Sequence, residues 1–158
     1  MTDYLLTLKL IHIVGAAILF GTGLGIAFFM WMAHRTRNAA VIAHTASMVV
    51  LADVVFTATA VIVQPVSGAF LAWAIGYSLW ESWIAVSLSL YVLVGLCWLP
   101  VVWIQVQLRD IAHGAAHDAS SLPPRYHRLF QIWFMLGWPA FIGVMAIFAL
   151  MIWRPKFW

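Results

Sequence analysis

Residues 10–32 read LIHIVGAAILFGTGLGIAFFMWM, and His12 is the one ionisable side chain in this stretch. A helix needs about 20 mostly apolar residues to cross the ~30 Å hydrocarbon core of a bilayer. Three further stretches of the chain have comparable length and composition. The sequence therefore predicts an all-α, polytopic membrane bundle of about four transmembrane helices, with spans near residues 4–32, 46–75, 83–108 and 127–153.

The composition of the whole chain supports a membrane protein. Of the 158 residues, 65% are apolar and 8% are charged, whereas soluble domains carry roughly 25% charged residues. We expect a single domain over residues 1–158, without nucleic-acid binding and without a cleavable signal peptide. Cys97 is the only cysteine, so no intramolecular disulfide is predicted.

Prolines fall inside three of the four spans, at Pro65, Pro100 and Pro139. A proline inside a helix removes a backbone donor and crowds the preceding turn, so each of these spans is predicted to kink. In lipid, such kinks are tolerated where neighbouring groups satisfy the freed carbonyls. An alternative is that the second span ends at Pro65 and is followed by a short or re-entrant segment.

Basic residues predict the orientation in the membrane. Positive side chains concentrate on the cytoplasmic side of membrane proteins. Lys9, Arg154 and Lys156 fall on one side of the predicted bundle. The other side, expected to be cytoplasmic, carries Arg35, Arg37, Arg109, Arg125 and Arg128. Both termini are therefore predicted to be periplasmic, with an aromatic belt on that side formed by Trp73, Trp80, Trp83, Trp153 and Trp158.

His12 is the first candidate for a functional residue. It lies ~12 Å along the first predicted helix from Tyr4, and Lys9 precedes it by one turn on the same face. Histidine within a bundle is a usual ligand of haem iron, but it also commonly bonds to a neighbouring helix. Both interpretations remain open. Counting along antiparallel helices places Ser67, Tyr91 and Met145 near its level.

The other five histidines lie toward the arginine-rich side, so a bis-histidine haem within one chain is not expected. A haem at His12 would be five-coordinate or take Met145 as a weaker sixth ligand. A pair formed by His44 and His127 is a second candidate site. His113 and His117 have the spacing of metal ligands on a helix but lie in a polar segment. Gly21, Gly23 and Gly25 would let another helix approach closely, within the chain or from a second copy.

Asp53 is the second candidate because a carboxylate inside a span must be paired, protonated or exposed to water. Arginines crowd the same side of the predicted bundle, so we expect a structural ion pair between Asp53 and Arg128. A proton relay is the alternative.

Several sequence blocks resemble a bacterial family of small integral membrane proteins of unknown function. They include Leu8–Ile13, Phe20–Gly25, Asp53–Phe56, Gln64–Gly68, Cys97–Trp103 and Leu122–Phe130. The Lys-x-x-His opening and the Ser-Gly near the end of the second span are also similar to the HemJ-type protoporphyrinogen oxidases. That resemblance implies a b-type haem held by the first-helix histidine, here His12. Those oxidases also use a lysine early in their third helix, where this chain has Ser87.

The function predicted from the sequence is a b-type haem protein of the bacterial inner membrane. It would work in electron transfer or porphyrin-linked redox chemistry. His12 would be the axial ligand, with Lys9, Tyr91 and Met145 around the cofactor. The expected partners are the bilayer, a second copy of the chain, and a quinone or other redox partner. The rival functions are a non-catalytic scaffold or accessory subunit and a small proton-coupled carrier centred on Asp53.

Overall fold

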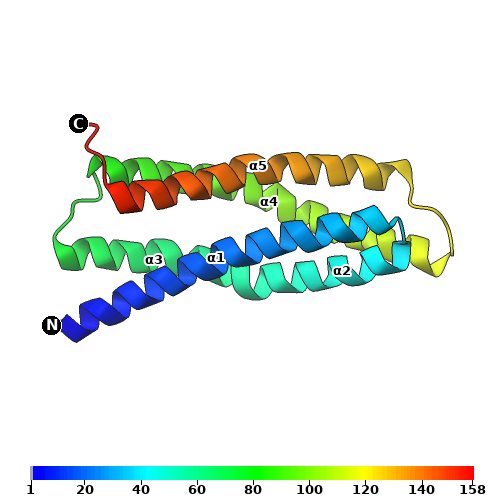
Figure 1. The fold of residues 1–158 in the computed structure, drawn as a ribbon, viewed down its shortest axis with the longest axis horizontal. Coiled ribbons are helices and arrows are strands. Elements are labelled where there is room, and N and C mark those ends of the chain that lie inside the picture. The colour runs from blue at the N-terminus through cyan, green and yellow to red at the C-terminus, as the bar shows by residue number, and fades with distance from the viewer. Residues whose placement is uncertain (1) are drawn as a thin grey trace.

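A computed structural model describes residues 2–158 and consists of long helices running side by side (Figure 1). Four helical rods, each long and apolar enough to cross a membrane, account for almost the whole described chain. The fold is therefore an all-α polytopic bundle, as the sequence predicts. The elements are α1 (Thr2–Thr36), α2 (Ala39–Ala52), η1 (Asp53–Thr57), α3 (Ala58–Ile75), α4 (Ser82–His117) and α5 (Pro124–Trp153).

The helices extend beyond the predicted spans at several ends. The second rod begins at Ala39, where Asn38 caps the helix by accepting hydrogen bonds from the backbone N–H groups of Ala40 and Val41. The third rod continues to His117, well past the apolar residues. These additions lengthen the bundle at the end where the arginines lie.

The second rod is continuous from Ala39 to Ile75, so the re-entrant alternative is wrong. Pro65 removes the helical bond to the carbonyl of Val61, and the Tyr91 hydroxyl of α4 donates to that carbonyl instead. The irregularity lies at the π-helical turn η1, where the N–H of Ala58 bonds to the carbonyl of Asp53. Gly76 ends the rod with φ 87°, a left-handed conformation that glycine adopts without strain.

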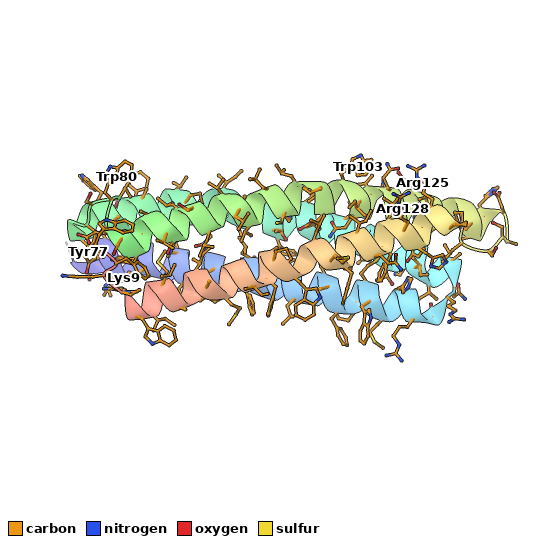
Figure 2. The ribbon with its side chains drawn as sticks, turned by 90° about the horizontal axis from the view of Figure 1, so that it is seen from above. Lys9, Tyr77, Trp80, Trp103, Arg125 and Arg128 are labelled. Carbon is orange, nitrogen blue, oxygen red and sulfur yellow. The ribbon has the colours of Figure 1, made fainter. Side chains whose placement is uncertain are left out.

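Both chain termini lie at the same end of the bundle (Figure 1). Figure 2 shows Lys9, Tyr77 and Trp80 near that end and Arg125 and Arg128 toward the other. Four of the five tryptophans predicted for an aromatic belt are strongly exposed: Trp73, Trp80, Trp153 and Trp158. Trp83 is the exception, because it is buried and has the Arg154 guanidinium over its ring.

The bundle packs differently in its two halves. We call the half of the bundle toward Arg125 and Arg128 the arginine half. There all four rods meet around one apolar core, in which Met30, Ile42, Leu108 and Tyr126 are almost completely buried. In the half that holds the termini, which we call the terminal half, α1 packs on α3 and α4 packs on α5. Gly143 marks the α4–α5 contact, since a Cβ there would meet Val94 Cγ2 at 2.6 Å.

Large apolar side chains cover the outside of the rods. In α5 only 6% of the most apolar 18-residue window is buried within the chain. An exposed apolar surface of this extent is typical of a lipid-facing protein and not of a soluble monomer. The chain is an integral membrane protein.

Candidate functional site

His12 lies half-buried on α1, against a short stretch of α3 in the terminal half. Its Nδ1 and the Oγ of Ser67 are 2.8 Å apart. The side-chain amide of Gln64 donates to the backbone carbonyl of His12 at 2.8 Å. One helix thus holds both the ring and the backbone of His12.

Two glycines allow this close approach. A Cβ at Gly68 would lie 3.2 Å from Cε1 of the His12 ring, and a Cβ at Gly15 would lie 2.5 Å from Nε2 of Gln64. Small residues at helix contacts in membranes allow backbones to approach and polar side chains to reach across. The glycines therefore make room for both bonds to His12.

The hydrogen bonds of Ser67 assign the tautomer of His12. Ser67 Oγ also lies 2.7 Å from the carbonyl oxygen of Val63 and 3.2 Å from that of Gln64. Because carbonyls only accept, the hydroxyl proton is used on them and Nδ1–H of His12 donates to Ser67. This leaves Nε2 as an unprotonated acceptor, the state in which imidazole binds a metal.

The other residues predicted around the cofactor are more dispersed. Lys9 is exposed one turn closer to the bundle end, where Figure 2 shows it. The hydroxyl of Tyr91 is used on the carbonyl of Val61, and Met145 is 44% exposed on α5. The structure therefore brings Ser67, Gln64 and Gly68 to His12, and gives Tyr91 a structural bond of its own.

Asp53 has a different environment from the predicted one. It is 3% exposed, at the start of η1, and its Oδ1 accepts a hydrogen bond from Nε1 of Trp98 at 3.3 Å. Arg128 is exposed on α5. The salt bridges within residues 2–158 join Arg109 to Asp110 and His117 to Asp118, so the predicted pair between Asp53 and Arg128 does not form.

The histidines of the arginine half have separate partners. His127 lies near His34, with ring centroids 5.9 Å apart, whereas His44 is exposed on α2. The predicted pairing of His44 with His127 is therefore replaced by one with His34. The His34 ring stacks on Phe130 at 3.7 Å, and its Nδ1 lies 3.3 Å from the hydroxyl of Tyr126.

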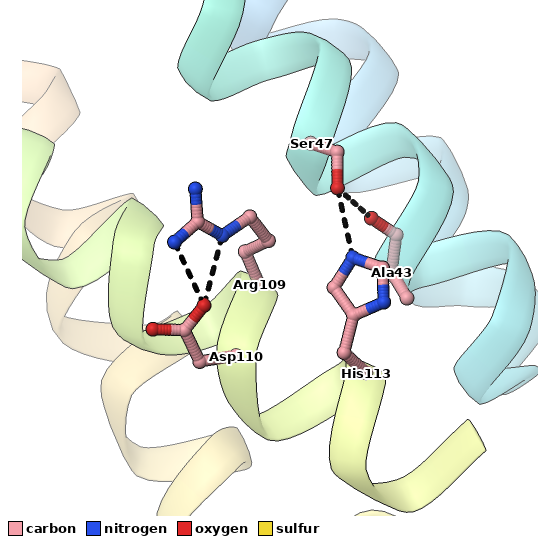
Figure 3. Close-up of polar contacts among 5 residues, drawn as sticks. All are labelled: Ala43, Ser47, Arg109, Asp110 and His113. Carbon is pink, nitrogen blue, oxygen red and sulfur yellow. Dashed lines mark hydrogen bonds and ion pairs between the residues drawn. The ribbon is translucent and has the colours of Figure 1, made fainter. Parts of the chain in front are cut away.

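His113 and His117 also point to different partners. Nε2 of His113 lies 2.9 Å from the Oγ of Ser47, which in turn donates to the carbonyl of Ala43 (Figure 3). Nδ1 of His117 bonds to Asp118 at 3.0 Å. In the described chain, no group of three or more His, Cys, Asp or Glu side chains is arranged to hold a metal ion. His113 thus ties α4 to α2.

Two shallow apolar pockets lie between α1 and α5, away from His12. The larger has a volume of about 280 Å³ and is lined by Leu24, Ala27, Phe28, Trp31 and Phe134. The second shares Trp31 and Phe134 with it. Their apolar lining is typical of a lipid-facing groove, and neither carries an ionisable group.

Sequence reasoning missed Gln64 as a partner of His12 and Trp98 as a partner of Asp53. Gln64 is the one amide side chain within the second predicted span, and an amide inside a span commonly bonds to a neighbouring helix, which is the signal that could have found it. Thr57 was also missed as a second buried polar residue of this turn, for which its four-residue separation from Asp53 is the signal.

Comparison with known proteins identifies one relationship. The family model described as "Predicted integral membrane protein (DUF2269)" matches residues 6–155. No curated protein and no solved structure shows a significant match to the chain.

Proposed function

This chain belongs to the DUF2269 family of predicted integral membrane proteins, and we propose that it binds a b-type haem through His12. The protein would work in electron transfer or porphyrin-linked redox chemistry in the bacterial inner membrane. The observation that carries the proposal is the 2.8 Å contact between His12 Nδ1 and Ser67 Oγ, which leaves Nε2 available as a ligand. Haem ligands commonly have this kind of support on the second ring nitrogen.

The residues around His12 fit an axial ligand better than a complete two-ligand site. Ser67 and Gln64 hold the histidine, and Gly68 lets its ring pack closely against α3. The other five histidines belong to the arginine half or its loop, so within one chain a haem iron would be five-coordinate or would take Met145 as a weaker sixth ligand. Haem, when bound, supplies one-electron redox chemistry. Lys9 is suited to pair with a propionate near the membrane surface.

A second candidate function is a scaffold or accessory subunit. The same two bonds to His12 hold α1 against α3, and a purely structural role of this kind is common for a histidine in a membrane helix. In that case the histidine needs no cofactor. The two functions differ in whether the protein carries haem.

Orientation and partners are part of the proposal. By the positive-inside rule, the end with the five arginines faces the cytoplasm and both termini are periplasmic. Outside the local helix backbone, nothing lies within 4 Å of a Cβ built at Gly21 or Gly25, so the face of α1 that they share is open to lipid or to a second copy. A homo-oligomer and a quinone or other redox partner complete the proposal.

The test is the absorption spectrum of protein purified in detergent from haem-supplemented cells. We expect a Soret band and, after reduction, the alpha band of b-type haem. His12→Ala should remove most of this absorbance, whereas His34→Ala, His44→Ala and His127→Ala should retain it. Colourless wild-type protein would reject haem binding and favour the scaffold. Haem lost with His34→Ala or His127→Ala but retained in His12→Ala would place the site in the other half.

A further inference from the structure

The turn η1 places the Asp53 carboxyl group inside the bundle with one identified bond. Its Oδ1 accepts from Trp98, but its Oδ2 is buried and has no hydrogen-bond partner among the described residues. An ionised carboxylate in such a place is costly unless a cation or several donors compensate it. The groups around Asp53 therefore decide whether its carboxyl group is ionised or neutral.

No basic side chain is available to neutralise Asp53. Residues 13–33 of α1, 98–108 of α4 and 129–153 of α5 contain no ionisable side chain, and residues 45–75 contain only Asp53 itself. The titratable groups nearest to it along α4 are Cys97 and Arg109, and Arg109 pairs with Asp110. Asp53 also lies 14 residues beyond Ala39, or ~21 Å along the rod, which is too deep for the arginines at the helix end.

Two further buried oxygen atoms near the second rod and α4 lack a hydrogen-bond partner within residues 2–158. Thr57 Oγ1 is one of them, four residues after Asp53 and at the other end of the same π-helical turn. Gln105 Oε1 is the other. Gln105 follows Trp98 by seven residues, two helical turns, so both lie on the face of α4 that meets the second rod. Thr57 and Gln105 also carry donor groups, but neither residue bonds to Asp53 in the structure, so among the described side chains the Trp98 N–H is the donor that reaches the carboxyl group.

We propose that Asp53 is a proton-binding site within the membrane: its carboxyl group is neutral and protonated on Oδ2, and the Oδ2–H turns to the Thr57 hydroxyl one helical turn away. The N–H of Trp98 identifies Oδ1 as the carbonyl oxygen, because an N–H can only donate. One proton, taken up from water, then cancels the negative charge and gives Oδ2 and Thr57 Oγ1 the hydrogen bond that both lack in the structure. The same N–H disfavours a metal cation, which would need several oxygen ligands at this point.

A role in proton transfer would suit the position of the group. π-Helical turns inside α-helices are frequent at functional sites, and protonatable carboxyls within spans commonly carry protons in membrane proteins. The site lies between η1 and α4, separate from His12, and it does not depend on haem binding.

The test uses a hydrophobic carbodiimide, which adds to a protonated carboxyl group but not to an ionised one. Full-length protein in detergent would be treated at neutral pH, in sodium chloride or in choline chloride, and the modified peptides found by mass spectrometry. Asp53 should be modified at least about tenfold more than Asp110, because an ordinary aspartate is almost fully ionised at pH 7. Asp110 is a suitable control since it is exposed and paired with Arg109.

Infrared spectroscopy tests the same state without a labelling reagent. The wild type should show a carboxylic-acid C=O band that Asp53→Asn removes. Thr57→Val should shift this band to higher frequency because the acid loses its acceptor, while Thr57→Ser should leave it in place. The Thr57 variants keep Asp53, so the test stands even if Asp53→Asn folds poorly. Protection from the carbodiimide by sodium but not by choline would overturn the proposal in favour of a sodium site, and absence of the acid band would overturn it in favour of an ionised carboxylate.

Discussion

The arginine half and the terminal half of this bundle solve the packing of four helices in different ways. The arginine half closes around an apolar core with Met30, Ile42 and Leu108 at its centre. The terminal half is built from two helix pairs, and its α1–α3 contact is made by His12, Gln64 and Ser67. In a bilayer, apolar packing gives a helix bundle its shape, whereas polar side chains between helices mark places for chemistry. The polar contact between α1 and α3 therefore makes the terminal half the better candidate for the site at His12.

The largest stability effect is expected in the arginine half. Leu108 is completely buried, and Leu108→Ala should lower the free energy of unfolding by about 2–5 kcal/mol because it opens a cavity. Leu99→Ala, on the exposed side of the same helix, is the matched control and should change it by less than about 0.5 kcal/mol. Unfolding in mixed micelles with increasing denaturing detergent measures both. Equal effects would remove the distinction between core and lipid-facing surface.

A methyl group at Gly68 tests the contact beside His12. Gly68→Ala should push against the His12 ring, where the Cβ would lie 3.2 Å from Cε1, and cost about 1–3 kcal/mol. Gly21→Ala is the control, because a Cβ there meets nothing within 4 Å. Thermal unfolding followed by circular dichroism compares the two. If Gly21→Ala is the more harmful, the face of α1 that appears open is in fact covered by another molecule.

Tyr91 and Pro65 provide a test of how the terminal half tolerates its proline. Tyr91→Phe should cost about 1–3 kcal/mol, because it leaves the carbonyl of Val61 without a donor. In a Pro65→Ala background the helix can supply its own N–H to Val61, so the same change should cost much less. A double-mutant cycle of unfolding free energies measures this coupling. Additive effects would show that Tyr91 does not compensate for Pro65.

The smallest effect is predicted for the amide bond to His12. Gln64→Leu should cost about 0.6 kcal/mol, the average value for a hydrogen bond between membrane helices. Gln107→Leu is a comparable amide change in the arginine half, where Gln107 accepts from Arg125 on the exposed surface. It should have no measurable effect on unfolding. A larger loss for Gln107→Leu would mean that the surface contacts of that half matter more than the contact at His12.

Much of the fold could be predicted from the sequence because the spans are set by composition and length. Counting along antiparallel helices also placed Ser67 near His12. The position of the irregularity in the second rod could not be predicted in this way. Pro65 was the expected break, but the Tyr91 hydroxyl replaces the bond that proline removes, and the π-turn occurs at Asp53 instead.

The predicted ion pair of Asp53 was wrong for a reason of depth. With a span starting at residue 46, Asp53 would lie ~11 Å from the helix end, within reach of an arginine side chain. The helix begins at Ala39, where Asn38 caps it, so Asp53 lies about twice as deep. The polar residues 34–38, together with His44, made the segment before residue 46 resemble an interfacial connection and concealed this extension. The contact with Trp98 depends on the packing of α4 and leaves no signal in the sequence.

The most direct test of the division between the two halves is a paired measurement of haem content and thermal midpoint. His12→Ala and Leu108→Ala would be purified side by side, and the ratio of haem to protein and the unfolding temperature determined for each. We predict that His12→Ala loses the haem while its unfolding temperature stays close to that of the haem-free wild type. Leu108→Ala should unfold at a lower temperature than the wild type. At temperatures where it is still folded, it should carry the same ratio of haem to protein as the wild type. Haem retained in His12→Ala, or lost from folded Leu108→Ala, would contradict the account.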